Sequence, residues 1–136
     1  MNERFPRVGV IGAGQLARMM VAPATALGVD LLLFAQSPAD SGAQLTHHVV
    51  GDYTDLDALK EFAANCDVVT FEHELVPLSV IRGLEAAGVR IYPPASAFIY
   101  SQDKAQMREK LSSYPSPEWK VVTSTQEIER YQLIAK

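Results

Sequence analysis

The 136-residue sequence predicts an α/β fold in which a parallel β-sheet is flanked by helices. Three observations predict it. Short apolar segments alternate along the chain with segments whose apolar residues recur at helical spacing. The first apolar segment runs through Gly12 and Gly14 directly into a helical segment. The hydrophobic fraction, 48%, is that of an ordinary globular domain.

The alternation is clearest in the first half of the chain. The expected strands are Arg7–Ile11, Asp30–Ala35, His48–Val50 and Asp67–Thr70. The expected helices are Gln15–Leu27 and Asp55–Ala64. Gly28 suits the C′ position of the first helix, and Pro23 inside that helix predicts a kink or a local break. Thr54 is the expected N-cap of the second helix.

The second half has a helix of its own and weaker signals after it. Pro77 suits the first turn of a helix because its missing N–H costs nothing there, and Gly88 ends that helix. Leu78, Ile81 and Leu84 form the apolar face of the helix. The remaining expected elements are a strand over Val89–Ile91, a helix from Ser96 to about Leu111, a strand over Trp119–Val122, a short helix opened by the capping box Ser124–Glu127 and a strand over Leu133–Ala135.

The chain length predicts one domain, or one domain followed by the beginning of another. The segment Ser112–Pro117 is rich in turn-forming residues and separates the last long helix from the C-terminal segment. We therefore expect a first domain over residues 1–112, and a linker with the start of a second module over residues 113–136.

Composition excludes several classes of partner. The net charge of -4 and the absence of a basic stripe argue against nucleic acid. No apolar segment is long enough to cross a bilayer, and the N-terminal residues do not resemble a signal peptide, so we expect a cytoplasmic protein without a membrane partner. Cys66 is the single cysteine and is expected to be a buried, inert thiol.

The segment Val8–Met19 carries the strongest functional signal. Gly12 and Gly14 lack a Cβ, so the backbone can turn tightly and approach a ligand closely. The residues after them would present free N–H groups at a helix N-terminus, where the helix dipole favours anions. The turn is therefore expected to bind a phosphate.

The same turn matches the dinucleotide fingerprint Gly-x-Gly-x-x-Ala, with Ala17 in the third position. A dinucleotide site also needs an acidic side chain at the end of the second strand to hold the ribose hydroxyls. That strand ends in Ala35 and Gln36, and Asp40 lies in a loop beyond Pro38. An NAD-dependent oxidoreductase is therefore a disfavoured alternative.

A pair of carboxylates comes directly after the fourth strand. In an extended segment, Glu72 and Glu74 share one face and His73 points away, which argues against a metal site at these residues. In a parallel sheet this segment would lie beside the glycine turn, so the pair suits a substrate that carries both a phosphate and a nitrogen. The alternative is that both glutamates are solvated, or cap the helix that begins at Pro77. Arg18 could reach a phosphate or be an ordinary surface residue.

Four parts of the chain carry a family resemblance: Gly12–Met19, Gly51–Asp55, Thr70–Pro77, and Ser101–Lys104 followed by Glu109–Lys110. Together they resemble the 5-(carboxyamino)imidazole ribonucleotide synthase family, the ATP-grasp ligases of purine biosynthesis. The resemblance extends from about Val8 to about Trp119. It implies a Rossmann-like parallel sheet, the domain that precedes the ATP-grasp module.

The resemblance implies a reaction and its partners. ATP would phosphorylate bicarbonate to carboxyphosphate, and the carboxyl group would then pass to the exocyclic amine of 5-aminoimidazole ribonucleotide. Mg²⁺ would assist, with its ligands and the ATP loop expected after Lys136, so that a chain of this length would not turn over by itself. A homodimer would suit the family.

The resemblance also implies site residues. Glu72 would hold the amine or the imidazole edge of the ribonucleotide, and Lys104 would contact ATP. The expected substrate-binding residues are Gly14, Gln15, Leu16 and Glu72, and the expected cofactor-binding residues are Lys104 and Lys136.

Two further alternatives stay open. The related glycinamide ribonucleotide transformylases are also ATP-grasp enzymes, but they usually have a glutamate where this chain has Gln15. A non-catalytic nucleotide sensor would show the same turn and the same fold.

Overall fold

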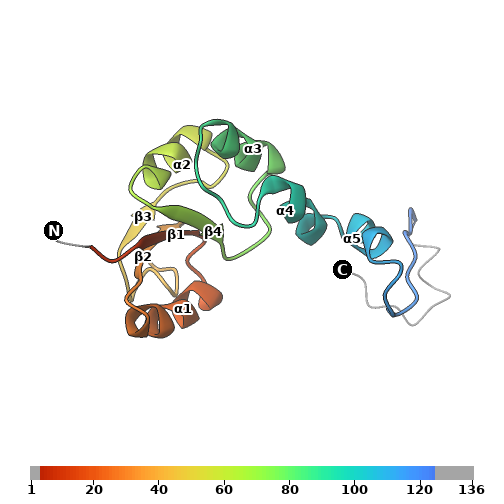
Figure 1. Ribbon diagram of the computed structural model, residues 1–136, viewed down its shortest axis with the longest axis horizontal. Coiled ribbons are helices and arrows are strands. Elements are labelled where there is room, and N and C mark those ends of the chain that lie inside the picture. Colours follow the sequence, from red (N-terminus) through yellow and green to blue (C-terminus); the bar gives the residue numbers. More distant parts are fainter. Residues whose placement is uncertain (1–3, 125–136) are drawn as a thin grey trace. The chain divides into compact units, whose positions relative to one another are not determined.

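The computed structural model describes residues 4–124 and contains a four-stranded parallel sheet. Its strands are β1 (Arg7–Ile11), β2 (Asp30–Ala35), β3 (His48–Val50) and β4 (Val68–Phe71). They lie in the order β3-β2-β1-β4, so β1 is paired on both sides (Figure 1). The α/β fold expected from the sequence is confirmed.

The register of the strands determines which residues meet at the carboxyl edge of the sheet. Ile11 is opposite Phe34 on one side and opposite Phe71 on the other. The ladder continues for one more residue, because the Gly12 N–H donates to the Phe34 carbonyl at 3.0 Å and the Glu72 N–H donates to the Ile11 carbonyl at 2.9 Å. The backbones of Gly12 and Glu72 are therefore held next to each other at this edge.

Helices cover both faces of the sheet. The helices of this part of the chain are α1 (Gln15–Ala26), α2 (Leu56–Ala63), α3 (Leu78–Ala86) and α4 (Ala95–Gln102). α1 lies on one face, while α2 and α3 lie on the other (Figure 1). Burial on both faces explains why the central strands are apolar at nearly every position.

Each face has its own core. Alternation along the strands sends Val10 and Leu33 toward α1, into a core made largely of alanine and leucine. Ile11 and Phe34 point the other way, into a larger core that contains Phe62. The rings of Phe34 and Phe62 meet edge to face, with 5.2 Å between their centroids.

Two details of the first half differ from the sequence-based expectation. α1 continues through Pro23 to Ala26, so the expected break does not occur. Asp55, not Thr54, is the N-cap of α2: its carboxylate accepts from the backbone N–H groups of Asp57 and Ala58 at 2.9 and 3.1 Å. A carboxylate is the stronger acceptor at a helix N-terminus.

Thr54 has another partner instead. Its backbone N–H and its hydroxyl both donate to the Asp52 carboxylate, each at 2.8 Å. The preceding aspartate thus closes a local turn and leaves the cap position to Asp55.

The expected strand over Val89–Ile91 is only an isolated bridge between Ile91 and Val69. The expected helix from Ser96 to Leu111 is two helices, α4 and α5 (Lys104–Lys110). Asp103 separates them because it has an extended backbone and its carboxylate caps α5, accepting from the Gln106 N–H at 3.0 Å.

The segment Trp119–Val122 is not a strand, because it has no ladder partner within residues 4–124. The expected helix after Ser124 and the expected strand over Leu133–Ala135 lie outside the described residues.

The chain divides into two compact units, residues 1–102 and residues 103–136. The sheet and α1–α4 belong to the first unit, and α5 belongs to the second. The sequence-based boundary after residue 112 stays a prediction. Within residues 4–124, no helix is both long enough and apolar enough to cross a membrane.

Candidate functional site

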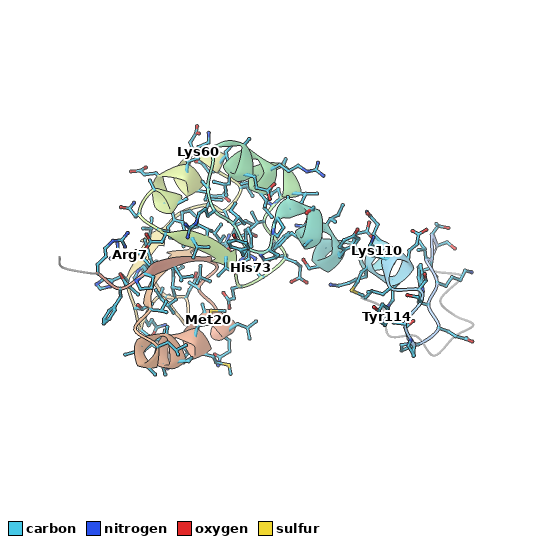
Figure 2. The ribbon with its side chains drawn as sticks, in the orientation of Figure 1. Arg7, Met20, Lys60, His73, Lys110 and Tyr114 are labelled. Atoms are coloured by element: carbon cyan, nitrogen blue, oxygen red, sulfur yellow. The ribbon has the colours of Figure 1, made fainter. Side chains whose placement is uncertain are left out.

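The candidate site lies at the carboxyl edge of the sheet, where ligands of open parallel sheets bind. Two segments meet there: the turn from Gly12 to Leu16, which joins β1 to α1, and the bend from Glu72 to Glu74, which comes after β4. His73, labelled in Figure 2, marks this edge. The expectation that these two segments come together is confirmed.

The Glu72 carboxylate occupies the turn itself. Its Oε2 accepts from the Gly14 N–H at 2.6 Å, and its Oε1 accepts from the Leu16 N–H at 3.0 Å. These are amides that the start of α1 cannot satisfy with its own carbonyls. A negative charge at this position is also stabilised by the helix dipole.

This finding corrects the expectation of free amides ready to bind a phosphate. The anion at the N-terminus of α1 is the protein's own carboxylate. It also corrects the alternative in which Glu72 is solvated or caps the helix at Pro77, since the helix that Glu72 caps is α1. The sequence could not show this, because the hydrogen bond joins residues 58 positions apart.

The two glycines make room for that carboxylate. Gly12 has a φ of 112°, and a Cβ there would lie 2.7 Å from the Glu72 Cβ and 2.8 Å from Oε2. A Cβ at Gly14 would lie 2.7 Å from Oε1. Both glycines are therefore required by the approach of a side chain from the end of β4.

His73 also belongs to the site, contrary to the expectation that it points away from Glu72. Its Cδ2 lies 3.0 Å from the position that a Gly12 Cβ would occupy, beside Glu72 Oε2. The chain bends at residues 72–74, so the two-residue alternation of a strand no longer holds there. Glu74 is exposed instead, and its carbonyl accepts from Gln102 Nε2 at 2.7 Å.

Two contacts orient the His73 ring. The Tyr53 ring meets it edge to face, with 5.2 Å between centroids. Its Nδ1 lies 3.3 Å from the Leu75 backbone nitrogen, which has only a proton to donate, so the ring proton is on Nε2. The site thus has an imidazole N–H donor close to a carboxylate acceptor. The polar residues Glu72–Glu74, which follow the apolar strand, are the sequence signal that could have indicated the bend.

The other turn residues leave the site open to solvent. Gln15 is exposed, and the Leu16 side chain is 56% exposed. Arg18 is exposed as well, and its Nη1 donates to the Ser41 carbonyl at 3.2 Å, so it ties down the neighbouring loop. The Glu72 oxygens retain lone pairs beyond the two backbone hydrogen bonds. The arrangement can therefore accept hydrogen bonds from a ligand that enters beside Gln15.

The end of β2 does not provide the carboxylate of a dinucleotide site. Asp40 accepts from the backbone N–H groups of Gln36 and Ser37 at 2.9 and 3.1 Å, and so closes its own loop. The Gly42 N–H donates to the Ala13 carbonyl at 2.7 Å and folds this loop onto the start of α1. An acidic side chain for the ribose of NAD is missing at the position where the fold would need it.

The opposite edge of the sheet contains only structural pairs among the residues described. Arg7 Nε bonds Asp30 at 2.6 Å, and Arg4 bonds Asp67 at 2.8 Å. The Arg7 backbone N–H lowers the pKa of Asp67, and the Arg4 charge adds to this effect. A hollow of about 290 Å³ at this edge is lined by these same arginines.

Cys66 lies near this edge, and burial raises the pKa of its thiol to about 11. A thiol with so high a pKa is a poor nucleophile at neutral pH, which agrees with the inert thiol expected from the sequence. The residue is half-buried, whereas the sequence analysis expected it to be buried.

The expected cofactor-binding residues are Lys104 and Lys136. Lys104 is the first residue of α5 and belongs to the second unit. Lys136 lies outside the described residues. Residues 4–124 contain no group of three or more His, Cys, Asp or Glu side chains that could hold a metal ion. The roles of both lysines therefore stay predictions.

Comparison with known proteins gives the family context of this geometry. Residues 5–102 match the family described as ribonucleotide synthetase preATP-grasp domain. The N5-carboxyaminoimidazole ribonucleotide synthase of Mycobacterium bovis is 45% identical over 109 residues, which are 79% of this chain and 25% of that protein. The chain thus spans about a quarter of the length of this curated relative.

Two solved structures have the same fold. The N5-carboxyaminoimidazole ribonucleotide synthetase of Thermus thermophilus superimposes with a TM-score of 0.76 at 32% identity, covering 90% of this chain and 34% of that one. The Aspergillus clavatus N5-carboxyaminoimidazole synthase, solved with ADP and 5-aminoimidazole ribonucleotide, superimposes with a TM-score of 0.72 at 30% identity, covering 93% and 35%.

Proposed function

The chain belongs to the ribonucleotide synthetase preATP-grasp domain family, and from this premise we propose that it is the ribonucleotide-binding part of an N5-carboxyaminoimidazole ribonucleotide synthase. This enzyme is the 5-(carboxyamino)imidazole ribonucleotide synthase that the sequence resembles. The observation that supports the proposal most directly is the Glu72 carboxylate, fixed against the β1–α1 turn at the edge of the sheet where ligands bind.

The proposed reaction carboxylates the exocyclic amine of 5-aminoimidazole ribonucleotide in purine biosynthesis. Bicarbonate is first phosphorylated by ATP to carboxyphosphate. The amine nitrogen then bonds to the carboxyl carbon as phosphate leaves, and the nitrogen loses one proton. The contribution proposed for this chain is to bind and orient the ribonucleotide, because positioning accounts for a large part of catalysis in such transfers.

The proposed roles depend on what each group can donate or accept. Glu72 accepts a hydrogen bond from the amine or the ring edge, since its oxygens retain lone pairs. Gln15, exposed beside it, offers a side-chain amide to the ribonucleotide, and Leu16 offers an apolar surface. Gly14 contributes by holding Glu72 through its N–H.

The partners that act outside this site are also proposals. Lys104 and Lys136 would contact ATP. Mg²⁺ would assist the transfer of the phosphoryl group from ATP. The proposed assembly is a homodimer of the complete enzyme.

A ligand titration followed by amide NMR tests the proposed function. We expect 5-aminoimidazole ribonucleotide to shift the amide signals of Gly14, Gln15, Leu16 and Glu72 in a saturable manner. NADH and glycinamide ribonucleotide should leave them unchanged. Glu72→Gln should weaken the binding of the ribonucleotide and leave the fold intact, because the amide keeps the shape of the side chain but loses its charge.

Glu74→Gln is the matched control, because it removes a carboxylate from the same bend at an exposed position. It should bind the ribonucleotide as the unchanged chain does. Saturation by NADH or glycinamide ribonucleotide, without a response to 5-aminoimidazole ribonucleotide, would show that the proposed substrate is wrong.

A further inference from the structure

We propose that Glu72 prevents anions from binding to the β1–α1 turn and lets the turn bind groups that donate hydrogen bonds. The ribonucleotide then presents its amino end to Gly14 and Leu16, and its phosphate points away from them. The orientation of the ribonucleotide rests on the proposed function. The exclusion of anions is a property of the turn itself.

The backbone N–H groups of the turn already have an acceptor. The two amides that a phosphate would need at this turn already donate to Glu72, at 2.6 Å from Gly14 and 3.0 Å from Leu16. An incoming phosphate would have to displace a carboxylate that is bound by both oxygens and stabilised by the α1 dipole. If the carboxylate stayed in place, the phosphate would face a like charge at contact distance.

Glu72 is also held in place by its backbone and its Cβ. Its backbone continues the sheet ladder, because its N–H donates to the Ile11 carbonyl at 2.9 Å. Its Cβ packs against Gly12, within 2.7 Å of where a side chain at that position would begin. Only rotation about the side-chain bonds can move the carboxylate, and any such rotation breaks both of its charge-assisted hydrogen bonds to the turn.

The Glu72 carboxylate can still accept hydrogen bonds from a ligand. Each carboxylate oxygen can accept more than one hydrogen bond, so Glu72 can receive an N–H or O–H from a ligand while it holds the turn. The ring of His73 lies beside Gly12 as well, with its proton on Nε2. This edge of the sheet therefore combines a carboxylate acceptor with an imidazole N–H donor. This combination suits a ligand that has both an amino group and an accepting ring nitrogen better than it suits a phosphate.

Inorganic phosphate tests the exclusion without any ribonucleotide. Amide NMR monitors Gly14 and Leu16 while phosphate is added to the unchanged chain and to Glu72→Ala. We expect no saturable shift in the unchanged chain. In Glu72→Ala we expect phosphate to bind the freed amides at least about tenfold more tightly, as an anion binds at an open helix N-terminus.

The matched control is Glu74→Ala, which removes the same charge from the same bend but no contact with the turn. It should respond to phosphate as the unchanged chain does. An equal gain in Glu74→Ala would show that general repulsion, not occupancy by Glu72, excludes the anion, and would overturn the proposal.

The unchanged chain alone can also overturn the proposal. A saturable shift of the Gly14 and Leu16 amides with phosphate would show that anions enter the turn in the presence of Glu72. This titration of the unchanged chain tests anion exclusion even if Glu72→Ala does not fold. If 5-aminoimidazole ribonucleotide does not bind at all, the proposed function fails, whereas the phosphate titration still reports on anion exclusion.

Discussion

Two loops at the carboxyl edge of the sheet each have a carboxylate that accepts hydrogen bonds from backbone N–H groups. One carboxylate comes from within the loop, and the other comes from a distant part of the chain. After β2, Asp40 accepts from the N–H groups of Gln36 and Ser37, four and three residues away. After β1, Glu72 accepts from Gly14 and Leu16, which are 58 and 56 residues away. Both carboxylates satisfy backbone donors that the regular elements leave without partners.

The difference lies in what each carboxylate connects. The two hydrogen bonds that the Asp40 carboxylate accepts both lie within a single loop. Glu72 joins the end of β4 to the turn that follows β1, so it depends on the register of β4 against β1. A local carboxylate therefore shapes a loop, while a distant one creates a site between two segments. Four predictions test that distinction, from the largest expected effect to the smallest.

The largest effect is expected for Gly12→Ala. This substitution adds a Cβ at a φ of 112° and places it 2.7 Å from the Glu72 Cβ, so we expect the free energy of unfolding to fall by about 3 kcal/mol, from strain and overpacking together. Urea unfolding monitored by circular dichroism measures the loss.

Gly88→Ala is the matched control. Gly88 has a φ of 80°, but a Cβ there would meet nothing within 4 Å, so we expect a loss of only about 1 kcal/mol, from strain alone. Equal losses for the two glycines would show that contact with Glu72 does not constrain the turn.

The second prediction compares the two carboxylates directly. Glu72→Ala should lower the free energy of unfolding by about 2 kcal/mol, because two hydrogen bonds to a charged group are lost at a half-buried position. Asp40→Ala should cost about 1 kcal/mol, the usual effect of losing a local cap. The same urea experiment measures both. A larger loss for Asp40→Ala would reverse the comparison.

The third prediction is a double-mutant cycle on the turn. The three atoms nearest to a Cβ at Gly14 all belong to the Glu72 side chain, so Gly14→Ala should cost about 1 kcal/mol in the unchanged chain and almost nothing when Glu72 is already alanine. Urea midpoints of the four proteins give the coupling energy. Additive effects would mean that Gly14 is needed for some reason other than the approach of Glu72.

The smallest effect concerns the acid dependence of another local carboxylate. The N–H of Thr54 and then its hydroxyl lower the pKa of Asp52 below its usual value. Asp52 therefore stabilises the fold above the pKa of the unfolded chain, and this stabilisation is lost as the pH falls through the lower folded pKa. Asp52→Asn should lose less stability than the unchanged chain between about pH 6 and about pH 2. Parallel losses for the two proteins would show that Asp52 has no part in the acid dependence.

Much of the fold could be predicted from the sequence because the relevant signals are local. The strands Arg7–Ile11, Asp30–Ala35 and His48–Val50 were expected with the bounds that the structure has. Apolar runs bounded by turn residues identify such strands. The details that were wrong depend on competition between neighbours: Asp55 replaced Thr54 as a cap, and Asp103 divided one expected helix into two.

The sequence by itself determined the alternation of strands and helices and the position of the glycine turn. It also determined that this turn lies next to the segment after β4. Only the tertiary structure decided which group fills that turn. Parallel register brings Glu72 beside Gly12, and the bend after β4 brings His73 there in place of Glu74. The physical reason is that a glycine turn before a helix presents the same amides whether its anion is a ligand or a side chain. The choice between the two depends on a residue 58 positions away, which no local pattern contains.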